Sequence, residues 1–148
     1  MRMIDFRAWD KKKSEILDVM DIDFSGNKVG VCNVPKRMFK DGRLHTIHSI
    51  ERDWSEVELM QSTGLKDKND TEIFEGDIVK RTYLFNGGYG ETHTGEVVYD
   101  KEYARYVISR PQEHIEPKNE DIRNILSDKS TYEVIGNIYE DIELLEEI

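Results

Sequence analysis

The sequence has too few cysteines to cross-link itself. Cys32 is the only cysteine among 148 residues, so an internal disulfide is excluded. A free cysteine that alternates with apolar residues is expected in a core. The first thirteen residues, MRMIDFRAWDKKK, also lack the apolar segment of a secretory signal. We therefore expect a protein of a reducing compartment, the cytoplasm of its host cell.

Long hydrophobic runs and an excess of positive charge are missing as well. No apolar run approaches the roughly 20 residues that cross a bilayer, so we expect a soluble protein. The formal net charge is −10; residues 1–60 carry 11 basic and 11 acidic side chains, whereas residues 61–148 carry 10 and 20. Such a charge repels phosphate backbones and disfavours nucleic-acid binding as the main role. A basic protein partner is compatible with it.

Motifs for metal binding, cofactor binding and catalysis are scarce. His45 and His48 lie on an expected strand, where a spacing of three places them on opposite faces, and His93 and His114 are isolated. With one cysteine, this set predicts no metal site. The glycines of residues 86–90 lack the third glycine and the following helix of a dinucleotide-binding loop, so we expect no cofactor. No G-x-S-x-G sequence marks a nucleophile, and we expect a protein that is not an enzyme.

Short alternating apolar segments, separated by turns that contain glycine, indicate a mainly β protein with short helices. Residues 15–24 and 28–34 predict a hairpin around the turn at 25–27. The Asp41-Gly42 turn predicts a second strand pairing, which continues through residues 43–50. The N-terminal part is therefore expected to be rich in hairpins. Since the charge balance changes near residue 60, we expect an N-terminal region 1–58 and a C-terminal region 59–148, which could also pack as one compact unit.

The C-terminal part shows the same pattern. Residues 73–85 and 92–110 predict a meander of strands. Residues 111–131 predict a loop with a short helix that begins at Asn119 as its N-cap. Residues 131–140 predict a last strand, and the final eight residues predict a terminal helical turn.

The stretch GLKDKNDTEIFEGDIVK, residues 64–80, concentrates acids, lysines and glycines around two short apolar segments. Residues 67–70 are turn formers, residues 72–75 predict a brief strand, and Gly76-Asp77 predicts a turn before the next strand. The acids do not have the alternating spacing and closing glutamate of a calcium loop. We interpret them as turn residues.

Three segments together resemble the YopX family of phage and prophage proteins: IDFRAWDKKKSEI (residues 4–16), LMQSTGLKDKNDTEIFEGDIVK (59–80) and YEVIGNIYEDIELLEE (132–147). They occur in the family's order and span nearly the whole chain. The resemblance implies a mainly β protein, encoded by phages or prophages of Gram-positive hosts, with an SH3-type small, partly open β-barrel in the C-terminal part. It implies no chemistry. Asp70-Thr71 departs from the glycine and lysine that are usual in the family.

The sequence thus favours a protein-interaction module of unknown biochemical function. Its expected partner is a host or phage protein, and the acidic C-terminal part favours a basic one. Self-association is a further expectation, because hairpins and open barrels leave strand edges to cover. The candidate partner-binding residues are one aromatic residue on a hairpin loop and the acids of the C-terminal tail: Tyr89, Glu140, Asp141, Glu143, Glu146 and Glu147.

Two alternatives remain open. A nucleic-acid-binding module would use Trp9 or Trp54 for stacking, although core anchoring is the common role of such rings. Its basic face would come from the lysines and arginines of the N-terminal part: Lys11, Lys12, Lys13, Lys36, Arg37, Lys40 and Arg43. A hydrolase with a spatially assembled site is the third reading.

Overall fold

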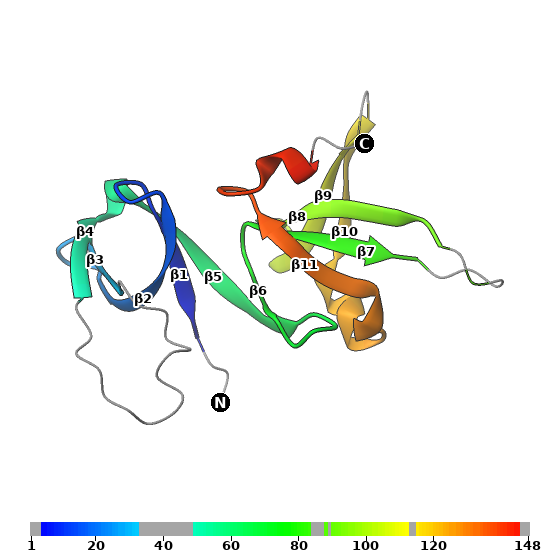
Figure 1. Ribbon diagram of the computed structural model, residues 1–148, viewed down its shortest axis with the longest axis horizontal. Coiled ribbons are helices and arrows are strands. Elements are labelled where there is room, and N and C mark those ends of the chain that lie inside the picture. The colour runs from blue at the N-terminus through cyan, green and yellow to red at the C-terminus, as the bar shows by residue number, and fades with distance from the viewer. Residues whose placement is uncertain (1–3, 33–48, 84–87, 89, 113–114, 146–148) are drawn as a thin grey trace. The chain divides into compact units, whose positions relative to one another are not determined.

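The structure, a computed structural model, describes residues 4–32, 49–83, 88, 90–112 and 115–145, and only the backbone at 111–112 and 115–117 (Figure 1). The chain divides between Gln61 and Ser62 into two compact units. The division falls inside one strand, β5 (Val57–Lys66). The first half of β5 pairs with a strand of the first unit and the second half with a strand of the second. Each unit has its own core.

The first unit is an antiparallel sheet in which strands follow the order β4-β3-β2-β1-β5 (Figure 1). The predicted hairpin of residues 15–24 and 28–34 is confirmed as β2 and β3. Asn27 closes the turn with φ 55, a left-handed conformation that asparagine tolerates. The second predicted pairing is described only from Ser49 onward, and residues 43–48 lie outside the described part. The strands are β1 (Phe6–Asp10), β2 (Glu15–Asp23), β3 (Lys28–Cys32) and β4 (Ser49–Asp53), and a 3-10 turn, η2 (Trp54–Glu56), leads into β5.

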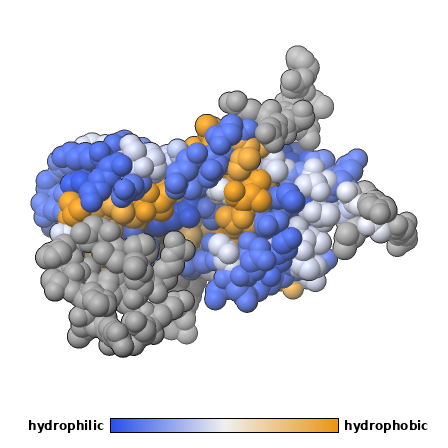
Figure 2. Space-filling view, in the orientation of Figure 1, coloured by the Kyte–Doolittle hydropathy of each residue, from blue (hydrophilic) through white to orange (hydrophobic). Residues whose placement is uncertain are grey.

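Alternation along these strands produces the first core. Cys32 is fully buried, as expected, but it directly follows Val31 in β3 and therefore lies on the face opposite to the core cluster. The inward side chains, most of them valines, form one cluster: Ala8, Leu17, Val19, Val29, Val31 and Val57. Burying apolar surface is the main favourable term in folding, at about 25 cal/mol per Å². On the face of the molecule in Figure 2, hydrophilic residues predominate and hydrophobic ones are confined to narrow bands.

The second unit contains a five-stranded antiparallel sheet in the order β10-β9-β8-β7-β11, which confirms the predicted meander and last strand. A short strand, β6 (Glu72–Phe74), pairs with the second half of β5 and leads through a turn into β7. The predicted order of turn, strand, turn and strand over residues 64–80 is therefore confirmed. The sheet strands are β7 (Asp77–Thr82), β8 (Thr92–Asp100), β9 (Arg105–Gln112), β10 (Ile115–Asp121) and β11 (Tyr132–Asn137).

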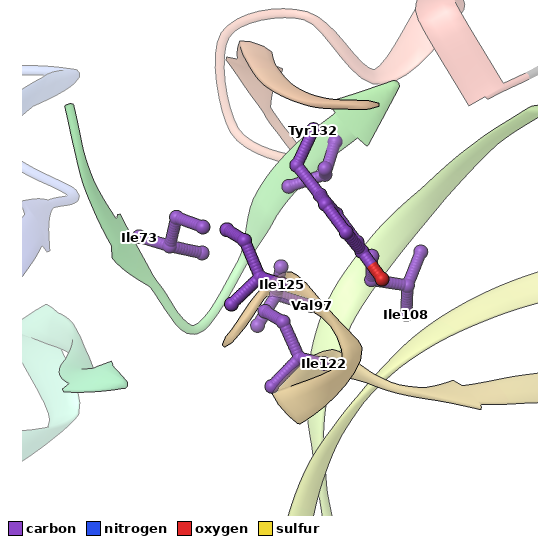
Figure 3. Close-up of a cluster of buried hydrophobic side chains, with 7 residues drawn as sticks. Ile73, Val97, Ile108, Ile122, Ile125 and Tyr132 are labelled. Carbon is purple, nitrogen blue, oxygen red and sulfur yellow. The ribbon is translucent and has the colours of Figure 1, made fainter. Parts of the chain in front are cut away.

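The second core lies on one face of this sheet. Figure 3 shows its side chains converging from segments that are far apart in the sequence. Tyr132 is the largest of them and has no exposed surface. Two isoleucines from a 3-10 helix, η3 (Ile122–Leu126), help to cover the cluster. The members are Ile73, Val79, Val97, Ile108, Ile122, Ile125 and Tyr132.

The prediction for residues 111–131 is partly wrong. Most of the expected loop is strand β10, and Asn119 pairs with Ser109 of β9 instead of capping a helix. Pairing with β9 satisfies backbone groups that a loop would leave to water. The helix begins two residues later, where the side chain of Asp121 accepts a hydrogen bond from the backbone N–H of Arg123 at 2.9 Å. Two further 3-10 helices follow, η4 (Lys129–Thr131) and, at the predicted terminal turn, η5 (Ile142–Leu145).

The strand pairings do not close a barrel in the described part of the chain. In the second unit β10 and β11 form the two edges of the five-stranded sheet. The fold shown is thus mainly β, built from two antiparallel sheets.

Candidate functional site

Asp67 is the most extensively bonded acid of the GLKDKNDTEIFEGDIVK stretch. Its side chain is fully buried. One carboxylate oxygen accepts hydrogen bonds from the backbone N–H groups of Asn69 and Thr71 at 2.8 and 2.9 Å, and the other accepts one from Val134 of β11 at 2.8 Å. Asp77, which is also buried, accepts from the N–H of Phe74 at 2.9 Å. These acids organise turns and fix β11 in place.

Asp10 has the corresponding role in the first unit. Its carboxylate is fully buried and faces the guanidinium of Arg52, with Nε at 3.1 Å from one oxygen and Nη2 at 3.2 Å from the other. It also accepts from the N–H of Lys12 at 3.1 Å in the turn after β1. The pair joins the turn at the end of β1 to strand β4. A charge pair with this geometry satisfies both partners internally.

The second unit contains a larger polar cluster around Arg81. The guanidinium of Arg81 is ion-paired with Glu120 and lies over two rings, 4.7 Å from the centroid of Tyr83 and 4.4 Å from that of Tyr132. Tyr83 and Tyr132 both donate hydrogen bonds to Glu120, the latter at 3.1 Å. Burial raises the pKa of the Tyr132 phenol, against the lowering effect of Arg81. The phenol is therefore protonated at neutral pH and acts as a donor.

These clusters offer little for reaction chemistry. Each buried acid already accepts from a named donor, and Arg81 is held by Glu120 and two aromatic rings, so no free base faces a nucleophile there. Within the described ranges, no three His, Cys, Asp or Glu side chains lie close enough together to hold a metal ion. Of the histidines, only His93 is described; its ring lies 3.1 Å from Glu91 and packs edge-on against Tyr83.

The acidic tail is only partly free to meet a partner. Asp141 turns back toward β11 and accepts from the N–H of Asn137 at 3.1 Å. Glu140 accepts from the side-chain amide of Asn137 at 3.1 Å but is itself exposed, as is Glu143. The structure thus brings Glu140 and Asp141 together around one turn. The other candidates, Tyr89, Glu146 and Glu147, lie outside the described residues.

An exposed aromatic pair in the first unit was missed by the sequence analysis. Phe24 and Trp54 are 74% and 39% exposed, and their rings meet edge to face with centroids 5.8 Å apart. The backbone N–H of Trp54 donates a hydrogen bond to the backbone carbonyl of Asn27 at 3.1 Å, which fixes η2 against the β2–β3 turn. The predicted strand over residues 15–24 includes Phe24 as its last residue, whereas β2 ends at Asp23. The missing signal was its position directly before the Ser25-Gly26 turn, where the strand has already ended.

Acids lie on the strands that lead into this pair. Across three neighbouring strands, Asp23 is in register with Lys28 and Lys28 with Asp53, and in the next row Asp21 and Glu51 flank Gly30. Residues opposite one another on antiparallel strands project from the same face. In these two rows of described residues, four carboxylates therefore share one face with one ammonium group, that of Lys28. We call this surface the aromatic–acidic corner, defined by Asp21, Asp23, Phe24, Glu51, Asp53 and Trp54.

The tryptophans differ in exposure. Trp9 is half-buried within β1, whereas Trp54 is exposed beside carboxylates. Three lysines of the predicted basic face are described. Lys11 and Lys12 form ion pairs with Glu58 and Glu56 at 3.1 and 2.6 Å, and Lys13 is exposed. Its other members beyond the β1–β2 turn lie outside the described residues: Lys36, Arg37, Lys40 and Arg43.

Comparison with known proteins identifies the family. Residues 5–146 match the family model described as YopX protein. The chain belongs to the YopX family. The YopX-family chain is also similar to a solved structure, described as the crystal structure of protein EF1440 from Enterococcus faecalis. The two are 28% identical, the match covers 98% of this chain and 99% of that one, and the TM-score is 0.59.

Two further findings concern this YopX-family chain. The search of curated proteins gave no match. Among the described helices, none has the length and apolar character that crossing a membrane requires.

Proposed function

We propose that this YopX-family chain is a non-enzymatic protein-interaction module. The observation that carries the proposal is the exposed Phe24–Trp54 pair. Large aromatic side chains on a surface are costly to hydrate, and tryptophan is enriched among the residues that dominate binding energy at protein interfaces. The buried acids, by contrast, are engaged in holding turns and strands. The exposed aromatic pair therefore favours binding of a protein partner over catalysis by the buried acids.

Family membership supports a proposal on where the protein comes from and where it acts. Membership of the YopX family favours an origin in a phage or prophage and work in the cytoplasm of the bacterial host. The five-stranded antiparallel sheet of the second unit, with its edges at β10 and β11, is compatible with an SH3-type small, partly open barrel. Open edges also favour self-association. Size-exclusion chromatography with light scattering measures the oligomeric state directly.

The proposal is tested by photo-crosslinking inside host cells. A photoreactive phenylalanine analogue replaces Phe24 in one variant and Leu126 in another; Leu126 is 75% exposed and lies in the second unit. We expect a defined adduct with another protein from position 24 and none from position 126. The absence of an adduct at 24, or the same adducts from both positions, would refute a specific interface at this surface.

Nucleic-acid binding is the second candidate, because Trp54 is exposed and able to stack. The carboxylates next to it oppose a phosphate backbone. Titration of the tryptophan fluorescence with single-stranded oligonucleotides at low salt decides between the two, and quenching that saturates would favour nucleic acid. A hydrolase gains no support from the described polar clusters; a panel of phosphoester, ester and glycoside substrates tests it.

A further inference from the structure

We propose that the aromatic–acidic corner binds a lysine- or arginine-rich segment of a protein partner. This inference rests on the proposed function and names the chemistry of the partner. It differs from the expectation drawn from the sequence, which assigned a basic partner to the acidic C-terminal tail. The corner combines two features that a basic segment can use together, free carboxylates and uncovered aromatic rings.

The first feature is a pair of carboxylates to which the described residues supply no counterion. Neither Asp21 nor Glu51 forms a side-chain hydrogen bond or an ion pair within the described part of the chain. Between them, β3 has Gly30, and a Cβ built there would lie 2.7 Å from a carboxylate oxygen of Asp21. The Asp21 carboxylate therefore lies over the strand backbone at Gly30, where the Ser49 hydroxyl also reaches, at 2.8 Å from the same point. Asp21 and Glu51 are both in register with Gly30, and a side chain at position 30 would displace the Asp21 carboxylate.

The second row consists of Asp23, Lys28 and Asp53. The contacts of Lys28 show that this surface favours positive charge. Lys28 forms an ion pair with Asp53. The pKa of Lys28 is raised, first by its hydrogen bond with Asp53 and further by the charges of Asp53, Glu51 and Glu56. These acids thus favour the charged form of Lys28, and the two described rows contain four carboxylates to this one ammonium group. A second cation from a partner would meet the same attraction.

The aromatic pair supplies the other half of the site. In an edge-to-face pair, each ring covers at most one face of the other, and Phe24 is left 74% exposed. Ammonium and guanidinium groups bind over such faces with about 0.5–1 kcal/mol at exposed positions. The aliphatic stems of lysine and arginine can also pack on the rings. Phe24 directly follows Asp23 at the end of β2, and Trp54 directly follows Asp53 at the end of β4, so the aromatic pair lies at the end of the two strands that carry the acids.

Other occupants fit the surface less well. Nucleic acid and anionic membranes would bring phosphates to a face of carboxylates. A second copy of the chain would bring mostly acids from its second part, since residues 61–148 carry 20 acidic and 10 basic side chains. A basic polypeptide segment is the class whose charge and shape complement both features.

The test uses the full chain and a fluorescein-labelled peptide of twelve residues, four repeats of Lys-Arg-Ala, followed by fluorescence polarisation at 25 and 300 mM NaCl. A peptide with glutamate in place of every lysine and arginine is the probe control. We expect the full chain to bind the basic peptide and not the glutamate peptide. Asp21→Asn combined with Glu51→Gln should weaken binding about fivefold at low salt, because two exposed charge pairs are lost. Phe24→Ala combined with Trp54→Ala should weaken it about tenfold at both salt concentrations, since contacts with rings are screened less.

A matched control removes the same charge elsewhere. Glu91→Gln combined with Glu102→Gln changes two exposed acids of the second unit, and we expect less than a twofold effect. Equal weakening by this control and by the Asp21/Glu51 variant would overturn the proposal in favour of attraction to net charge alone. Binding of an oligonucleotide in preference to the peptide, or an unaltered peptide affinity in both corner variants, would also overturn it.

The crosslinking experiment separates this result from a failure of the proposed function. Should position 24 give a defined adduct while the basic peptide fails to bind, the interface stands and the chemistry assigned to its partner is wrong. Should neither be observed, both proposals fail. Tryptophan fluorescence spectra and thermal unfolding of each variant establish that it is folded before its affinity is compared.

Discussion

Replacement of Asp67 provides the sharpest test of how the second unit is held together. Its carboxylate accepts three backbone hydrogen bonds, from Asn69, Thr71 and Val134, at 2.8 to 2.9 Å. Water can replace the acceptor for Asn69 and Thr71, which are exposed, but less readily for Val134 in strand β11. A hydrogen bond to a charged group contributes about 1.5–3 kcal/mol, and ordinary ones about 1. We therefore expect Asp67→Ala to lower the free energy of unfolding of the second unit by about 3 kcal/mol.

A milder substitution separates charge from geometry. Asp67→Asn keeps one oxygen for Asn69 and Thr71 but turns an amide N–H₂ toward the N–H of Val134, so we expect a loss of about 2 kcal/mol. The matched control is Asp70→Asn. The Asp70 side chain is 76% exposed and its φ of 61 suits asparagine, so losing its surface ion pair should leave the unfolding midpoint nearly unchanged.

The distribution of aromatic residues makes the assay specific. Both tryptophans lie in the first unit, at positions 9 and 54, and all seven tyrosines lie at position 83 or beyond. In a urea titration, tryptophan fluorescence follows the first unit and the tyrosine band of the near-ultraviolet circular dichroism follows mainly the second. Asp67→Ala should shift the tyrosine transition. A shift no larger than that of Asp70→Asn would refute the assignment of Asp67 as the anchor of β11.

Three further predictions follow the same logic. Arg52→Met leaves the buried Asp10 carboxylate without its partner and should destabilise the first unit by about 3 kcal/mol, as a shift of the tryptophan transition; an unchanged midpoint would contradict a structural role for the pair. Gly95→Ala would place a Cβ 2.8 Å from a backbone oxygen of β9, so we expect a loss of about 1–3 kcal/mol in the tyrosine transition, whereas neutral behaviour would show that the strands separate easily. The hydrogen-bonded guanidinium of Arg123 lowers the pKa of Asp121 from 3.8 to about 2. Since the folded pKa is the lower one, this stabilisation is present above pH 4 and is lost as the pH falls toward 2; Arg123→Gln should flatten that part of the tyrosine-detected stability profile, and an unaltered slope would refute the coupling.

Local patterns predicted the strands well where their turns contain residues that dictate a conformation. The β2–β3 hairpin followed from alternation around Ser25-Gly26-Asn27, and the segment from Asp67 to Asp77 followed from its turn formers. The helix start was misplaced because Asn119 and Asp121 are both good N-cap residues, and pairing with β9 decided between them. The sequence therefore located the segment and left its boundary to a contact with another strand.

The candidate site was harder to predict for the same reason. The acids of the tail were predicted as partner-binding residues because they are close together in the sequence. Asp141, however, turns inward and accepts a hydrogen bond from the backbone N–H of Asn137. The aromatic–acidic corner is assembled from two segments, around residues 21–24 and 51–54, that are separated along the chain and brought together by register with β3. No pattern within either segment reveals the other.

The sequence by itself determined the mainly β character of this protein and the turns that separate its strands, because these depend on side-chain periodicity and on the backbone preferences of single residues. Its three family-typical segments likewise determined its YopX-family membership. Only the tertiary structure decided which acids are consumed in the interior and which face outward, and that Phe24 and Trp54 meet. Those outcomes depend on strand register, which is set by packing and hydrogen bonds between segments distant in the chain.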